Sequence, residues 1–109
     1  MDLKELTAEM NRFVNTKGWY DASSPRGQTP RNLAISLSLE SAEILEHFQW
    51  TDTTTDPEGL SEELADVALY LLQLANVSHI DLENAILAKL KKNYTRQWDQ
   101  PSDKRKEQS

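Results

Sequence analysis

The sequence predicts an all-α fold, with four main helices in each protomer and a helical bundle that is completed by oligomerisation. Apolar residues recur at helical spacing in four segments, and polar stretches rich in turn-forming residues separate these segments. Only three glycines and four prolines interrupt the chain, of which 38% is apolar and 28% charged, as is typical of a soluble helical domain. The length of 109 residues suits one domain with a modest core.

The first helix is expected over residues 3–14, where five apolar residues follow a helical period, and Gly18 suits the position just past its end. These five residues are Leu3, Leu6, Met10, Phe13 and Val14. Two aromatic residues, two prolines and a glycine follow in residues 19–30, which therefore form a loop.

The second helix begins with Thr29 as N-cap and Pro30 as first residue, and it is expected to run to about Trp50. Its apolar residues cover more than one stripe, which predicts that two of its faces are buried. A polar loop, TDTTTDPEG, leads to a third helix over about 58–78. Either Asp56-Pro57 or Ser61 is suited to start this helix.

The third helix is apolar on nearly all sides, and a single protomer of this size has too few helices to enclose it. Burial against a second copy therefore predicts an obligate homo-oligomer. Asp81 caps a fourth helix that extends to about Trp98. Residues 1–98 are thus expected to form the domain, and the tail of residues 99–109, without apolar side chains, is expected to be disordered.

Composition excludes several classes of function. The absence of cysteine excludes disulfides and thiolate sites, and the net charge of −6 argues against non-specific nucleic-acid binding. No apolar run is long enough to span a membrane, and the N-terminus does not resemble a signal peptide, so a cytoplasmic location is expected. None of the glycines lies in a phosphate-binding loop or a dinucleotide-binding pattern.

Two acidic pairs, each inside an apolar helix, are the main candidates for chemistry. Glu40 and Glu43 lie three residues apart on the second helix, as do Glu63 and Asp66 on the third, so each pair faces one way. Packing of the two helices would gather four carboxylates, whose mutual repulsion calls for a cation. Oxygen ligands of this kind favour Mg²⁺ over Zn²⁺. Either pair alone would more often be part of a solvated face.

Other polar and aromatic residues allow two interpretations each. On the fourth helix Lys89, Asn93 and Arg96 either meet phosphate oxygens or form a solvated basic face near the helix C-terminus. The aromatic side chains of Trp50 and Tyr70 either stack on a base or belong to the core, and Trp19 either caps the core or contacts a ligand.

The two histidines, His47 and His79, have no partner at metal-ligand spacing and are expected to be ordinary residues at helix ends. Without a Glu-x-x-His motif on each of two helices, a di-iron oxidoreductase is disfavoured.

The motifs LESAEIL at 39–45 and EELADV at 62–67, followed by Lys89 and Asn93, resemble those of the MazG-type nucleoside triphosphate pyrophosphohydrolases. The resemblance spans about residues 13–98 and is strongest to the short all-α branch that contains the dCTP pyrophosphatases. It departs in two places. Gln28 and Thr29 precede Pro30 where dCTP-specific relatives tend to carry His, and Arg96-Gln97-Trp98 replaces an Arg-Tyr-Pro.

The resemblance implies Mg²⁺-dependent hydrolysis of a (deoxy)nucleoside triphosphate, dCTP or a modified dNTP among the candidates, to the monophosphate and pyrophosphate. Mn²⁺ is expected to substitute. It implies a homodimer or tetramer, no nucleic-acid or membrane partner, and a role in removing unwanted nucleotides. The implied residues are metal ligands Glu40, Glu43, Glu63 and Asp66, phosphate contacts Lys89 and Asn93, and base-pocket residues Trp19, Trp50 and Tyr70.

In the mechanism that follows as a hypothesis, Glu40 or Glu43 orients or deprotonates the water that attacks the α-phosphorus, and both therefore count as catalytic. Arg96, one turn beyond Asn93, is a further candidate for substrate binding. The alternative function is a non-catalytic acidic helical dimer whose carboxylates bind a basic partner.

Overall fold

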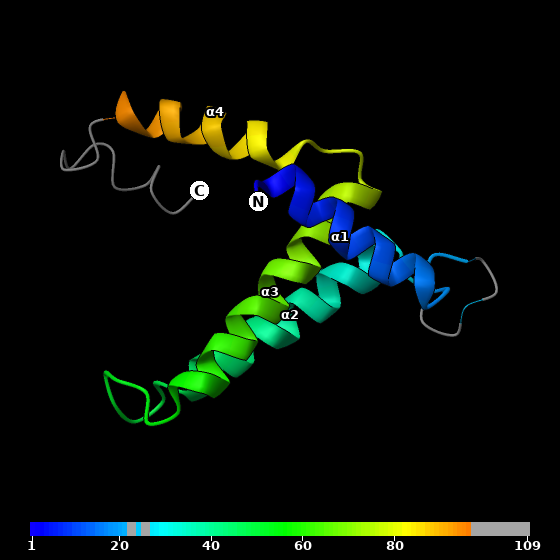
Figure 1. The fold of residues 1–109 in the computed structure, drawn as a ribbon. Helices are drawn as coiled ribbons and strands as arrows, with labels where there is room; N and C mark the ends of the chain where they lie inside the picture. Colours follow the sequence, from blue (N-terminus) through cyan, green and yellow to red (C-terminus); the bar gives the residue numbers. More distant parts are fainter. Residues whose placement is uncertain (22–23, 25–26, 97–109) are drawn as a thin grey trace.

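Four helices and no strand make up the part of the chain that the computed structural model describes, residues 1–21, 24 and 27–96 (Figure 1). The helices are α1 (Leu3–Thr16), α2 (Pro30–Glu46), α3 (Pro57–Val77) and α4 (Leu82–Tyr94). The all-α prediction is thereby confirmed. Trp98 and the expected disordered tail lie outside the described residues.

Each helix starts at a residue whose side-chain oxygen accepts the backbone N–H three positions further along. These N-caps are Asp2, Thr29, Asp56 and Asp81. They satisfy one of the four backbone N–H groups that a helix leaves without a partner at its start. Proline follows Thr29 and Asp56 at the first helical position, so Asp56-Pro57, rather than Ser61, starts α3. Gly18 follows α1 with a positive φ of 70°, as its position in the sequence suggested.

Two predicted helix ends were too late. The second helix ends at Glu46 rather than near Trp50, because the backbone N–H of His47 turns back to the Ile44 carbonyl and the imidazole of His47 binds residues beyond the helix. The fourth helix ends at Tyr94, where the N–H and hydroxyl of Thr95 both bond to the Lys92 carbonyl. In both cases a backbone N–H that turns back to a helix carbonyl ends the helix within a sequence of helical periodicity.

Helices α2 and α3 lie side by side and run in opposite directions, and α1 crosses them near the C-terminal end of α3 (Figure 1). The core lies where α1 meets α3, around Met10, Val14 and Leu72. Leu33 of α2, with 2% of its surface exposed, is also buried. The aromatic residues after α1, Trp19 and Tyr20, pack against this cluster.

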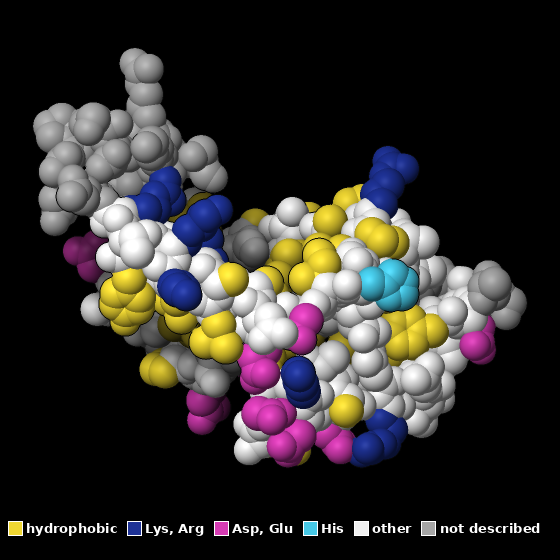
Figure 2. All heavy atoms as spheres, turned by 90° about the horizontal axis from the view of Figure 1, so that it is seen from above, with side chains coloured by type: hydrophobic (Ala, Val, Ile, Leu, Met, Phe, Trp, Pro, Cys, Tyr) yellow, Lys and Arg dark blue, Asp and Glu magenta, His cyan; other side chains and the backbone are white. Residues whose placement is uncertain are grey.

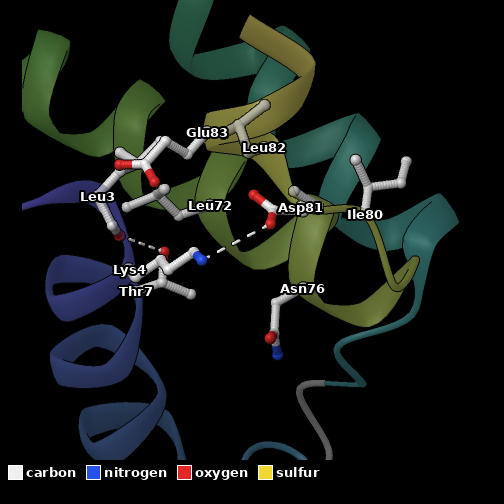
Figure 3. Close-up of a pocket in the computed structure, with 10 residues that line it drawn as sticks. Leu3, Lys4, Thr7, Leu72, Asn76, Ile80, Asp81, Leu82 and Glu83 are labelled. Atoms are coloured by element: carbon white, nitrogen blue, oxygen red, sulfur yellow. Dashed lines mark hydrogen bonds and ion pairs between the residues drawn. The ribbon is translucent and has the colours of Figure 1, made fainter. Parts of the chain in front are cut away.

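Helix α4 diverges from the other three and makes few contacts with them (Figure 1). Only its beginning is held, at a cavity of about 230 Å³ between α1, the end of α3 and the turn before α4. Figure 3 shows Lys4 of α1 pointing to Asp81, and their Nζ and Oδ2 atoms lie 4.0 Å apart. Both side chains are largely exposed, so this ion pair contributes little to stability.

Apolar side chains lie at the surface of all four helices, and Figure 2 shows several of them on one face. On α2 and α3, Leu39 is 63% exposed, Leu45 67% and Leu64 51%. The second apolar face of α2 and much of the apolar surface of α3 are thus uncovered in one copy of the chain. No helix of the described residues is long and apolar enough to cross a membrane.

Candidate carboxylate site and nucleotide pocket

The four predicted carboxylates come together between α2 and α3. Burial raises the pKa of Glu40 above its ordinary value, and Glu43, Asp66 and Glu63 raise it further through their negative charge. A side-chain hydrogen bond with Glu43 acts in the same direction. Since these effects act only at short range, both acidic pairs face the same space. The packing of two helices has thus brought together residues that lie up to 26 positions apart in the sequence.

Two oxygens in this group are shielded from solvent and accept no hydrogen bond from the described part of the chain. They are Oε2 of Glu40 and Oε2 of Glu63. Buried carboxylate oxygens without partners are costly unless a cation or a donor reaches them. No three acidic or histidine side chains among the described residues converge as tightly as metal ligands do. The donor atoms nevertheless suit a hard cation such as Mg²⁺, which keeps several waters and takes only a few protein carboxylates.

His47 belongs to this site, although sequence reasoning treated it as an ordinary residue at a helix end. Its Nε2 lies 2.6 Å from Oε2 of Glu63, without the alignment of a hydrogen bond, and its Nδ1 lies 2.8 Å from the hydroxyl of Thr54. Thr54 also accepts the backbone N–H of Asp56, the cap of α3. No spacing rule would find this contact, because the loop between α2 and α3 creates it. His79 is exposed and lies in the turn after α3.

A second feature lies beside the carboxylates, between α1 and α3. A cavity of about 510 Å³ is lined mainly by apolar side chains of these helices and has Asp66 in its wall. A more polar cavity of about 290 Å³ adjoins it, since Trp19, Tyr70 and Gln73 line both. Two of the three predicted base-pocket residues, Trp19 and Tyr70, therefore line the same cavities. Trp50 is 87% exposed in the turn after α2 and does not reach them.

The predicted phosphate-binding residues Lys89 and Asn93 lie on α4, and Arg96 follows the end of this helix. Lys89 and Arg96 line one shallow pocket of about 280 Å³ with Lys92 and Thr95. No residue of α2 or α3 contributes to this pocket. Oδ1 of Asn93 is shielded from solvent and accepts no hydrogen bond from the residues that the structure describes. A single copy of the chain thus separates the predicted phosphate contacts from the predicted metal ligands.

Comparisons with known proteins identify the family of the chain. The model of the MazG-like family matches residues 35–109. The dCTP pyrophosphatases 1 of Mus musculus and Homo sapiens are each 36% identical over 104 residues, covering 87% of this chain and 56% of their own. The chain therefore spans about half the length of these curated relatives.

Among solved structures, a pyrophosphatase from Archaeoglobus fulgidus superposes with a TM-score of 0.66 at 38% identity. The match covers 84% of this chain and 87% of the archaeal chain. The family model includes the part of α2 that bears Glu40 and Glu43, together with α3 and α4, and the fold similarity includes most of the chain. The chain belongs to the MazG-like family.

Proposed function

We propose that the chain hydrolyses nucleoside triphosphates to the monophosphate and pyrophosphate with the help of Mg²⁺. The observation that carries the proposal is the group of four carboxylates between α2 and α3, with a shielded oxygen of Glu40 that accepts no hydrogen bond from the described part of the chain. Such a group is destabilising by itself and becomes favourable when a cation is bound. The relatives named above are pyrophosphatases, two of them dCTP pyrophosphatases, which supports the same activity.

Glu40, Glu43, Glu63 and Asp66 would hold the ion, and their oxygens suit Mg²⁺, with Mn²⁺ as a substitute. When bound, Mg²⁺ neutralises negative charge on the triphosphate and so stabilises the transition state of phosphoryl transfer. Because the four carboxylates repel one another, binding of the ion removes an unfavourable electrostatic interaction.

The side chain of Glu40 or Glu43 orients a water molecule and accepts its proton. The water oxygen forms a bond to the α-phosphorus, and the bond from this phosphorus to the bridging oxygen of the β-phosphate breaks. Pyrophosphate leaves, and the monophosphate remains. The two glutamates remain alternatives for this role.

The base of the substrate occupies the cavity between α1 and α3. The volume of about 510 Å³ suits a small ligand, and Trp19 and Tyr70 supply aromatic faces on which a base can stack. Asp66 lines this cavity and is also one of the four carboxylates, so the proposed position of the base adjoins the proposed metal site. The triphosphate therefore points toward α2, and the base lies beneath α1. dCTP and modified deoxynucleoside triphosphates are the preferred candidates.

The functional unit is a homo-oligomer, a dimer or a tetramer, in which α4 of one copy approaches the carboxylates of another. In one copy the basic residues Lys89 and Arg96 line a pocket to which no residue of α2 or α3 contributes. The exposed apolar residues of α2, α3 and α4 provide the surface for such an assembly. Trp50, exposed in one copy, is then available to a neighbouring pocket. A cytoplasmic location and a role in removing surplus or modified nucleotides remain predictions.

The test is pyrophosphate release from a panel of ribo- and deoxynucleoside triphosphates, with Mg²⁺ and with EDTA. Turnover should require Mg²⁺, and Glu43→Gln should lower it by about 10²- to 10⁴-fold. Glu46→Gln is the matched control, because Glu46 is exposed on the same helix one turn further on. Glu62→Gln, at an exposed neighbour of Glu63, should likewise have little effect.

A folded protein without turnover on any nucleotide, whose melting temperature does not respond to Mg²⁺, would contradict the proposal. The alternative, an acidic helical dimer that binds a basic partner without catalysis, would then be the better description.

A further inference from the structure

Three residues of α3 line the cavity between α1 and α3 in a row. Asp66, Tyr70 and Gln73 occupy positions i, i+4 and i+7, which places them on one face of the helix. At 1.5 Å per residue, Asp66 and Gln73 are about 10 Å apart along the helix axis. This distance is on the scale that separates the α-phosphate of a nucleotide from the far edge of its base. The row thus begins at a carboxylate, passes an aromatic ring and ends at an amide.

Gln73 is the one polar residue that is buried among those the structure describes, with 5% of its surface exposed. Its Nε2 donates to Oε1 of Gln28 from the loop before α2, over 2.5 Å. A buried amide is unfavourable unless its hydrogen bonds are made, so this contact fixes the side chain in one orientation. Gln28 also lines the polar cavity. It is one of the two residues before Pro30 that differ from the His that dCTP-specific relatives tend to carry there.

The hydrogen bonds of Tyr20 and of Gln73 show which atom of the Gln73 amide is left for a ligand. Its hydroxyl donates to Oδ1 of Asn11 over 2.7 Å, and Asn76 donates to the same oxygen. Burial raises the pKa of Tyr20, while hydrogen bonds with Asn76 and Gln73 oppose that rise. The Nε2 of Gln73 donates to Gln28, which leaves its Oε1 as the atom of the amide suited to a ligand.

We propose that Oε1 of Gln73 accepts a hydrogen bond from an exocyclic amino group of the substrate base, and that this contact makes the enzyme prefer cytosine to uracil. The proposal rests on the function proposed above and adds a specificity-determining residue to it. A buried acceptor discriminates strongly, since a carbonyl in place of the amino group would face it without a proton to share. Gln28 acts on the base through Gln73 and is a positioning residue.

Cytosine and uracil nucleotides form a matched pair for the test, because they differ at the base edge in an amino group against a carbonyl. The measurement is kcat/KM for dCTP and dUTP with wild type and Gln73→Met, which keeps the length of the side chain and removes the acceptor. Wild type should prefer dCTP, and Gln73→Met should lower kcat/KM for dCTP by about tenfold or more while changing that for dUTP little. Gln28→Met, which releases the amide, should reduce the preference by a smaller factor.

Gln49→Met is the matched control, because Gln49 is exposed in the turn after α2 and the substitution is the same. Thermal melting of each variant checks that it folds. An equal fall in kcat/KM for both substrates, or a wild-type preference for dUTP, would overturn the proposal.

Calorimetric binding of non-hydrolysable analogues of both nucleotides, with Mg²⁺, separates this proposal from the proposed function. Hydrolysis with a dCTP-to-dUTP ratio that Gln73→Met leaves unchanged would refute the specificity proposal and keep the enzyme. In a second outcome, the protein hydrolyses no nucleotide, and it binds the cytosine analogue more tightly only while Gln73 is present. This outcome would support the specificity proposal and refute the proposed activity.

Discussion

The α2–α3 pair and α4 differ in how much of their surface is packed within one copy of the chain. The helices α2 and α3 pack against each other and bring four carboxylates together, and α3 also lines the cavity that we propose for the base. On α4 no residue is buried, and Leu87, Leu90 and Tyr94 are 58%, 48% and 89% exposed. One copy of the chain thus assembles the carboxylate half of the proposed site, whereas the half on α4 packs against little else in that copy.

The exposed apolar residues of α4 support the proposal that a second copy of the chain covers this helix. An amphipathic helix whose apolar face meets no partner gains little from folding, since most helical stability in proteins comes from packing of that face. Only five apolar residues are buried in the described chain, which is few for a domain of this length. A second copy that covers α4 would stabilise the fold and bring Lys89 toward a set of carboxylates.

The largest effect expected from this comparison concerns one leucine in each region. Leu72→Ala, at a position that is 3% exposed on α3, should lower the free energy of unfolding by about 2–5 kcal/mol. Leu90→Ala, on α4, should cost little at protein concentrations where the chain is monomeric, and clearly more where it is assembled. Chemical denaturation at widely separated protein concentrations measures both. A cost for Leu90→Ala that does not depend on concentration would contradict the assembly through α4.

An intermediate effect is expected at His47, which ties the end of α2 to Glu63 of α3. Residues that hold a metal-binding carboxylate in place are typically worth about 10- to 100-fold in metal affinity. His47→Asn should therefore weaken Mn²⁺ binding by a factor in this range, as measured by calorimetry or by the electron paramagnetic resonance of the free ion. His79→Asn is the control, because His79 is exposed with a positive φ of 58° that asparagine tolerates. Equal affinities in both variants would show that His47 has no part in the site.

The smallest effect is a dependence of stability on pH, from Glu40. Since its pKa is raised in the folded state, the folded protein binds this proton more tightly than the unfolded one. Its contribution to stability is full below the ordinary carboxyl pKa of 4.5 and is lost as the pH rises through the raised value.

In the metal-free protein, Glu40→Gln should therefore melt higher than wild type above this window, by an amount that shrinks as the pH falls. Thermal melting in EDTA at a series of pH values measures the difference. Mg²⁺ should remove the disadvantage of wild type. A wild type that melts higher than Glu40→Gln at neutral pH without metal would show that the carboxylates do not repel one another.

Much of the fold was accessible from local sequence signals. The cap residues Thr29 and Asp81 marked two helix starts, and the acidic pairs were found from spacing alone, because i and i+3 share a helical face whatever the tertiary structure. The end of α2 was not accessible, since it depends on contacts of His47 with Glu63 and Thr54, which come from other parts of the chain.

The rest of the site depended on tertiary placement. The role of Gln73 could not be predicted from the sequence, because it depends on a hydrogen bond with Gln28, which lies 45 positions away in the chain. The direction of α4 was equally hidden, since periodicity tells which face of a helix is apolar and not what covers it. The pairing of Trp19 with Tyr70 came from the resemblance to a family, and the cavity that they share gives it a physical basis.

The central claim, that α4 of one copy completes the carboxylate site of another, is tested most directly by mixing two inactive variants. Asp66→Asn damages the carboxylates, and Lys89→Ala damages α4. If each site combines α2 and α3 of one copy with α4 of its neighbour, a dimer of one copy of each variant holds one site with both defects and one intact site. Unfolding and refolding an equal mixture should then restore about a quarter of wild-type pyrophosphate release, while each variant alone stays inactive. A mixture that has the mass of a dimer and remains inactive would contradict the claim.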